Sequence, residues 1–239
     1  MNSFARDATI VLVHGAWADG SCWQKVILPL ENEGLKVTCA PIPLTSLSAD
    51  IASLERVLQR GSGPVVLAGH AYGGAVIAGP VDDRVRSLVY IAALAPAEGE
   101  TVADVFYRAK PHRAAPHLQP DAHGMIWMPE GGFAHAVSHK AFPEQAAILQ
   151  AVQRPIAVKC IQEKAPVPTW KTKPSWFLLA EEDRMIAPET QRYMAQRMGA
   201  EVRAYPVDHS PMHTDPHAVV DVILEAARQT LARGGWASA

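Results

Sequence analysis

Short runs of β-branched and other apolar residues alternate with amphipathic stretches along most of the chain. This alternation is typical of β-α-β units, so we expect an α/β fold, a mostly parallel sheet flanked by helices. At 239 residues and 49% hydrophobic composition, the chain can bury one substantial core as a single domain, residues 1–239. The apolar runs predict strands at 9–13, 35–40, 65–68, 87–92, 175–180 and 201–206.

The amphipathic stretches between these runs predict helices at 23–33, 50–59, 188–198 and 216–231. Pro29 implies a kink or a late start in the first helix. Asp215 is suited to cap the last helix, because its carboxylate can accept a backbone N–H. The residues from 232 to 239 are expected to be loose.

The segment from about 97 to 173 interrupts the alternation. It holds five of the ten histidines and many prolines, and it shows no clear buried strand. An insertion of this kind between two strands usually forms a helical cap over the strand ends, where open α/β sheets bind their ligands. We therefore predict a cap that belongs to the same domain.

A sharp turn is predicted after the strand at 65–68, in the sequence Gly69-His70-Ala71-Tyr72-Gly73. A tight turn from a buried strand into a helix crowds the backbone, so glycines suit the flanking positions, where side chains would clash. The central residue, Ala71, then projects over the end of the sheet. A serine hydroxyl at this position could attack a carbonyl carbon, whereas the methyl group of alanine cannot.

Four segments together resemble the α/β-hydrolases, and in particular the small-esterase branch that includes plant methylesterases and hydroxynitrile lyases. They are Val-Leu-Val-His-Gly-Ala-Trp at 11–17, the turn around Ala71, Glu182-Asp183, and Asp208-His209. Their order along the chain (nucleophile position, acid, histidine) is the order of this fold. The resemblance implies an α/β-hydrolase fold and a catalytic triad whose nucleophile position holds alanine.

Within this resemblance, His209 and Asp183 are the predicted base and orienting acid. His209 follows the predicted strand 201–206 in a polar loop, where an imidazole can take a proton from a nucleophile and return it to a leaving group. Asp183 would hold the ring in the required tautomer. Its rivals are the nearby carboxylates Glu181, Glu182 and Asp208.

The developing oxyanion of acyl transfer needs two convergent N–H donors. The turn supplies one from the backbone of Tyr72, and the resemblance implies Ala16 as the other. Trp17, together with Phe106 and Trp127 in the predicted cap, is a candidate contact to an apolar substrate.

Composition argues against several other functions. The formal net charge is -2 and no basic run is present, so no nucleic-acid partner is expected. No apolar stretch reaches the roughly 20 residues that span a bilayer, and the start lacks a signal-peptide pattern, so we expect a cytoplasmic protein without membrane contact. The cap histidines form no recognisable ligand set, and Cys22, Cys39 and Cys160 are expected to be reduced thiols. Neither a metal nor a cofactor is predicted.

The predicted function is that of a carboxylesterase-type serine hydrolase for a small-molecule, apolar ester, inactive or nearly so because of Ala71. Since the other triad members are present, the favoured interpretation is an inactivated variant in which alanine replaces serine. Two alternatives stay open: a noncatalytic binder of small ligands, and chemistry that needs only a His–Asp base, such as a cofactor-independent dioxygenase. Hydroxynitrile lyase activity is disfavoured, because that branch carries a lysine where this chain has Ser210. Whether the chain forms a homodimer is left open.

Overall fold

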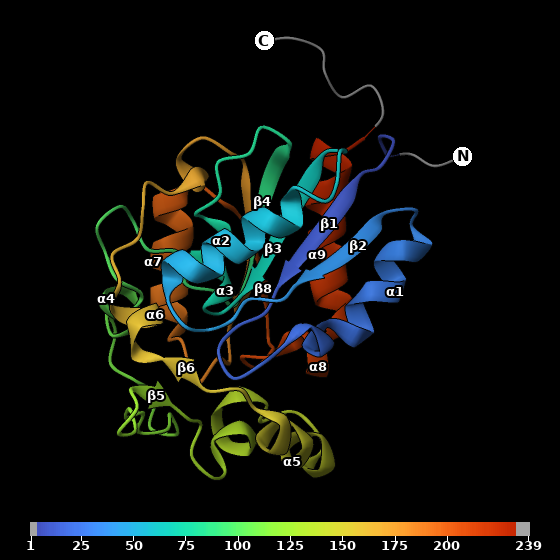
Figure 1. The fold of residues 1–239 in the computed structure, drawn as a ribbon. Coiled ribbons are helices and arrows are strands. Elements are labelled where there is room, and N and C mark those ends of the chain that lie inside the picture. Colours follow the sequence, from blue (N-terminus) through green and yellow to red (C-terminus); the bar gives the residue numbers. More distant parts are fainter. Residues whose placement is uncertain (1–3, 233–239) are drawn as a thin grey trace.

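The computed structural model describes residues 4–232 and contains a six-stranded sheet with helices on both faces (Figure 1). Neighbouring strands are parallel throughout, in the order β2-β1-β3-β4-β7-β8. The strands are β1 (Thr9–Val13), β2 (Lys36–Ala40), β3 (Val65–His70), β4 (Val85–Ile91), β7 (Ser175–Ala180) and β8 (Glu201–Tyr205). The predicted α/β fold is confirmed, and each predicted strand overlaps an observed one.

Burial follows the position of each strand in the sheet. β3, in the centre, is buried along its whole length, whereas the edge strands β2 and β8 keep exposed residues. A strand covered on both faces needs apolar side chains at successive positions, and residues 65–68 supply them. Because β3 is paired on both sides, the turn that follows it is held firmly at the centre of the sheet's carboxyl edge.

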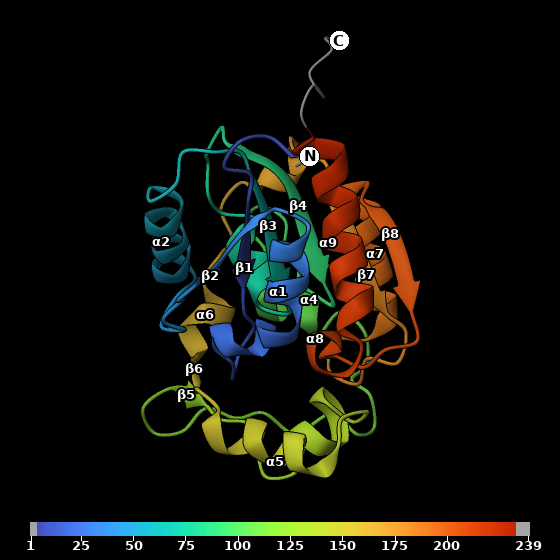
Figure 2. The same cartoon turned by 90° about the vertical axis from the view of Figure 1, so that its right-hand side faces the viewer.

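Two layers of helices cover the sheet, each with its own apolar core (Figures 1 and 2). One layer comprises α1 (Gln24–Asn32), α8 (Pro211–Thr214) and α9 (Pro216–Thr230). The other comprises α2 (Leu47–Leu58), α3 (Gly73–Ile77) and α7 (Pro188–Met198).

The predicted helix ends agree with the structure to within one residue except at the start of α2, which begins three residues earlier than predicted because Ser46 caps it. α7 has the predicted bounds, and the side chain of Asp215 accepts a hydrogen bond from the Ala218 amide at the start of α9, as predicted for a cap. α1 begins at Gln24, after a 3₁₀ turn (Gly20–Trp23), and Pro29 lies inside it. Residues 233–239, part of the tail expected to be loose, lie outside the described residues.

The segment 97–173 lies outside the six-stranded sheet, and most of it covers the carboxyl edge (Figure 2). Its last residues run back to the amino end of β7, where the Thr169 amide donates to the carbonyl of Ala78. It contains α4 (Val102–Phe106), β5 (Met125–Ile126), a π-helical turn (Phe133–Val137), α5 (Pro143–Val152), β6 (Ile156–Ala157), α6 (Val158–Gln162) and a 3₁₀ turn (Thr169–Lys171). The prediction that it has no buried strand is wrong, because β5 and β6 pair antiparallel and bury Ile126 and Ile156. Strands of two residues are too short to leave an alternating pattern in the sequence.

Candidate active site

The turn after β3 has the strained geometry that the sequence predicts. Ala71 has a φ of 48°, in the left-handed region that residues with a Cβ rarely adopt. A Cβ atom on Gly69 would lie 2.6 Å from the carbonyl oxygen of Gly73, and one on Gly73 would lie 2.6 Å from that of Val13. Backbone atoms cannot yield by this much, so both positions require glycine, and the Ala71 methyl group is held at the edge of the cavity.

His209 and Asp183 form a buried pair beside this turn. The Nδ1 atom of His209 lies 2.8 Å from Oδ2 of Asp183, and the two side chains are 5% and 0% exposed. Each residue follows the carboxyl end of its strand, β8 and β7, so parallel neighbours bring them together. With Nδ1 bound to the carboxylate, Nε2 is the nitrogen available to a molecule in the cavity, which His209 lines.

Asp183 is itself held by several donors. Its Oδ1 accepts hydrogen bonds from the backbone amides of Met185 (2.7 Å) and Ile186 (2.9 Å), and its Oδ2 accepts one from Nε2 of Gln191 (2.8 Å). Such bonds compensate the cost of burying a carboxylate and fix its direction. Gln191, on α7, was missed by the sequence reasoning, since a single glutamine on an amphipathic helix carries no distinguishing pattern.

A second histidine, His70, supports the first and was also missed. Its Nε2 donates to the backbone carbonyl of His209 at 2.7 Å, and the two ring centroids are 4.9 Å apart. Burial, and secondarily the neighbouring His209, hold the pKa of His70 well below its usual value, so its ring is neutral. The signal available in the sequence was its place as the last residue of a buried strand, directly before Ala71.

Two backbone amides beside Ala71 are unpaired. Among residues 4–232, neither the Ala16 nor the Tyr72 N–H donates to a protein acceptor, although both residues line the cavity. Because Gly15 has no Cβ, the segment that holds Ala16 can approach the turn at Ala71 closely. A Cβ placed on Gly15 would lie 3.0 Å from Cβ of Ala71. Amides without a protein acceptor can donate to a bound ligand, so this pair suits an oxygen that carries negative charge.

The side chain of Tyr72 faces away from the cavity and anchors the turn. Its hydroxyl donates to Oδ2 of Asp50 at 2.6 Å, and Oδ1 of the same carboxylate accepts from the Leu44 amide at 2.8 Å. Burial raises the pKa of Asp50, and the hydrogen bond from Tyr72 opposes that rise. Tyr72, the predicted oxyanion donor, is therefore tied to α2 through its own phenol group.

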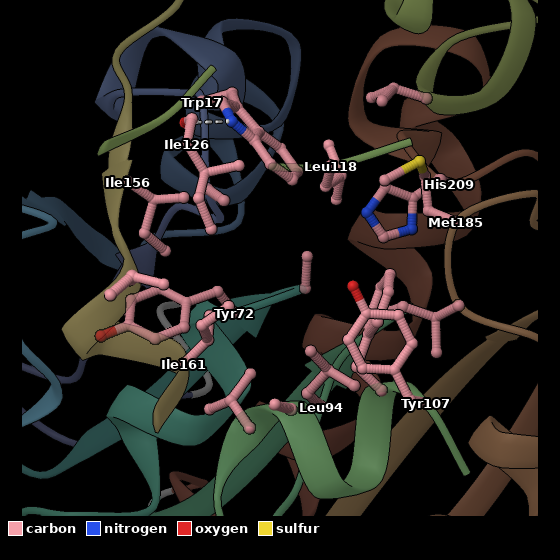
Figure 3. Close-up of a pocket in the computed structure, with 18 of the residues that line it drawn as sticks. Trp17, Tyr72, Leu94, Tyr107, Leu118, Ile126, Ile156, Ile161, Met185 and His209 are labelled. Carbon is pink, nitrogen blue, oxygen red and sulfur yellow. Dashed lines mark hydrogen bonds between the residues drawn. The ribbon is translucent and has the colours of Figure 1, made fainter. Parts of the chain in front are cut away.

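The cavity between sheet edge and cap has a volume of about 280 Å³. Trp17 and Phe106, two of the predicted substrate contacts, line it, and the indole of Trp17 is fixed by a 3.0 Å hydrogen bond to the carbonyl of Ile126 (Figure 3). Other lining residues are mainly apolar: Leu94, Val102, Leu118, Ile126, Val137, Ile156, Val158, Ile161, Met185 and Ile186.

The prediction that Trp127 contacts the substrate is wrong. Trp127 is 49% exposed, does not line the cavity, and donates its indole N–H to Oδ2 of Asp121 at 3.2 Å. Successive side chains of an extended segment point to opposite sides, so once Ile126 faces the cavity Trp127 faces outward.

Two polar residues of the cap, Tyr107 and Gln162, line the cavity. Among the described residues, neither side chain has a hydrogen-bond partner. In Figure 3 the hydroxyl of Tyr107 points into the cavity on the side of His209. The ring of Tyr107 packs edge-on against Phe106, with centroids 4.9 Å apart.

Asp208, the rival carboxylate next to His209, has a different role. It accepts hydrogen bonds from the Lys140 amide (3.0 Å) and the Thr214 hydroxyl (2.7 Å), and so ties the cap to the loop that bears His209. Within residues 4–232, no group of three His, Cys, Asp or Glu is placed to hold a metal ion, and no helix is long and apolar enough to cross a membrane.

Comparison with known proteins places this geometry in a family. Residues 10–222 match the alpha/beta hydrolase family. The chain belongs to that family. The alpha/beta hydrolase fold accounts for the order of Ala71, Asp183 and His209 along the sheet edge.

Individual relatives of this alpha/beta hydrolase span nearly its whole length. A pyrethroid hydrolase of Sphingobium wenxiniae is 24% identical over 261 residues, covering 95% of this chain and 92% of the relative. Methylesterase 2 of Arabidopsis thaliana is 23% identical over 260 residues, covering 95% and 98%. The crystal structure of a polyneuridine aldehyde esterase mutant superposes with a TM-score of 0.79 at 18% identity, covering 91% of this chain and 98% of that one.

Proposed function

We propose that the cavity is the substrate site of a carboxylesterase for small apolar esters, in which Ala71 occupies the nucleophile position. The chain as it stands then binds such esters and hydrolyses them very slowly. The observation that carries the proposal is the buried His209–Asp183 pair, which borders a cavity whose floor includes Ala71. The names of the relatives, a pyrethroid hydrolase and a methylesterase, support an ester as the substrate class.

The residues present would complete the reaction once a hydroxyl stood at position 71. The serine oxygen would attack the ester carbonyl while Nε2 of His209 took its proton, and Asp183 would stabilise the imidazolium. The amides of Ala16 and Tyr72 would hold the oxyanion. His209 would then protonate the leaving alcohol, and water would release the acid by the same steps.

The cavity favours a compact, mostly apolar ester. Its volume of about 280 Å³ and its aliphatic lining suit one small ring or a short chain on each side of the carbonyl. The Tyr107 hydroxyl and the Gln162 amide can each meet one further polar group of the substrate.

The test compares the chain with its Ala71→Ser variant on a panel of short-chain aryl and alkyl esters. We expect kcat/KM to rise by at least ~10³-fold, because triad members act as a unit. Adding His209→Gln to the serine variant should remove the gain. No gain from the serine would overturn the proposal in favour of a noncatalytic binder. An equal, substantial rate in both chains would indicate serine-independent chemistry.

A further inference from the structure

We propose that the chain, without a nucleophile, catalyses proton transfer at a carbon next to a carbonyl group, with His209 as base and small apolar ketones as substrates. The inference rests on the binding site of the proposed function, but it concerns a different reaction. It follows from what remains around Ala71 once the serine oxygen is absent.

The methyl group of Ala71 leaves the base open to the ligand. In a complete triad, the serine oxygen lies between the imidazole and the carbonyl carbon and hydrogen-bonds to Nε2. Here Nδ1 of His209 is bound to Asp183, and among the described residues no group hydrogen-bonds to Nε2. A bound ketone can therefore bring an α-hydrogen to Nε2, into space that a serine oxygen would fill.

The anion formed by this transfer has a ready site. An enolate bears its charge on oxygen, as a tetrahedral intermediate does, so the same donors stabilise both. Ala16 and Tyr72 line the cavity beside Ala71, and among the described residues neither amide has a protein acceptor. A ligand carbonyl oxygen that accepts hydrogen bonds from these amides would be stabilised, and the stabilisation would increase as negative charge develops on the oxygen.

The surroundings hold the base in position. His70 is neutral, packs beside His209 and donates to its backbone carbonyl at 2.7 Å, which fixes the loop without adding positive charge. Asp183 supplies the compensating negative charge at 2.8 Å. The largely apolar lining limits competition from water for Nε2.

The step balances without another reactant. The α-C–H bond breaks and its electron pair forms the carbon–carbon double bond, while the carbonyl π pair moves to oxygen. The proton becomes bonded to Nε2 of His209. Reversal returns a proton to carbon, and in heavy water a deuteron exchanged from solvent takes its place.

The experiment follows deuterium incorporation into phenylacetone by NMR, in heavy water, with the folded full chain. We expect exchange of one of the two benzylic hydrogens at least ~10²-fold faster than in buffer, with one handedness of product. His209→Gln should reduce exchange to the buffer rate. His217→Gln is the matched control, because His217 is exposed on α9, away from the cavity, and should leave the rate unchanged.

Ala71→Ser separates this inference from the esterase proposal. The new hydroxyl should hydrogen-bond to Nε2, lowering the exchange rate about 10-fold while ester hydrolysis rises. If hydrolysis rises but the original chain exchanges no faster than buffer, the proton-transfer inference fails and the esterase proposal stands. If exchange is stereospecific and depends on His209 but serine gives no hydrolysis, the esterase proposal fails alone. Exchange that persists in His209→Gln overturns the inference; should that variant unfold on heating earlier than the parent, Asp183→Asn replaces it and must also slow exchange.

Discussion

The sheet side and the cap side of the cavity differ in burial and in hydrogen bonding. On the sheet side, His209, Asp183 and the turn at Ala71 are buried, and hydrogen bonds of 2.7–3.3 Å link them to other buried groups. On the cap side, Tyr107 is 55% exposed and its hydroxyl has no protein partner among the described residues. Under the proposed function, we expect the chemistry to depend on the hydrogen-bonded sheet side and the choice among ligands to depend on the cap side.

The largest loss of stability should come from adding one carbon atom to the turn on the sheet side. In Gly73→Ala, the new Cβ would lie 2.6 Å from the carbonyl oxygen of Val13 and 2.7 Å from that of His14. We expect a loss of about 4 kcal/mol or more in the free energy of unfolding, because two backbone segments must separate. Urea denaturation measures it.

Gly61→Ala is the matched control for this loss. A Cβ on Gly61 would meet nothing within 4 Å, and its backbone is not left-handed. We expect its effect to stay within about 0.5 kcal/mol. Similar effects for the two variants would show that the turn is not the rigid element described above.

The next largest effect on stability should come from acid. Burial lowers the pKa of both His14 and His213 to about 4, below the value of 6.5 that unfolded histidine has. Between these values the unfolded chain binds more protons than the folded one, so stability is complete above about pH 6.5 and falls as the pH drops toward 4. The two histidines together predict a loss of roughly 3–4 kcal/mol between pH 7 and pH 5.

Chemical denaturation at a series of pH values tests this dependence. His213→Gln should remove one proton from the slope, whereas His217→Gln, at an exposed position, should leave it unchanged. A slope that His213→Gln does not alter would contradict the assignment of His213 to the acid-sensitive set.

Two buried tyrosines give a smaller and more specific comparison. Tyr72→Phe deprives Asp50 of the 2.6 Å hydrogen bond and should cost about 1–3 kcal/mol. Tyr90→Phe removes a buried hydroxyl that has no partner in the structure, so it should be neutral or slightly stabilising. Equal losses measured by thermal unfolding would mean that the hydroxyl of Tyr72 does not anchor the turn.

The cap side should respond in substrate affinity with little change in stability. In the Ala71→Ser background, Phe106→Ala should raise KM for an aryl ester about 10-fold, because a cavity-lining ring is lost. Trp127→Ala, at a residue outside the cavity, should leave KM unchanged. A rise in KM for Trp127→Ala and none for Phe106→Ala would reverse the roles that the structure gives them.

The same contrast explains how far prediction from sequence could reach. The strands and the glycines at 69 and 73 follow from local patterns that a sequence displays. The pairing of Asp183 with His209 was predicted from the resemblance to the α/β-hydrolases, and the neighbouring strands β7 and β8 bring the two residues together. His70 and Gln191 act through bonds to a distant carbonyl and a distant carboxylate, which no local pattern encodes. The cap was predicted only as a region. Trp127 and Phe106 are both aromatic residues of the cap, and the sequence does not show which of them points toward the cavity.

The left-handed conformation at position 71 has a practical consequence. Because the glycines on both sides and the pairing of β3 dictate this backbone, not the side chain at position 71, a different side chain there should leave in the same direction, into the same enclosed space. Different reactive side chains can therefore be introduced at position 71 with the same orientation. Ala71→Cys would place a thiol near His209, where it could react with any reagent small enough to enter the cavity. Because alanine forms no covalent bond with a ligand, any covalent product of such a variant would come from the introduced group. The variant would therefore show which molecules can pass the cap and enter the cavity.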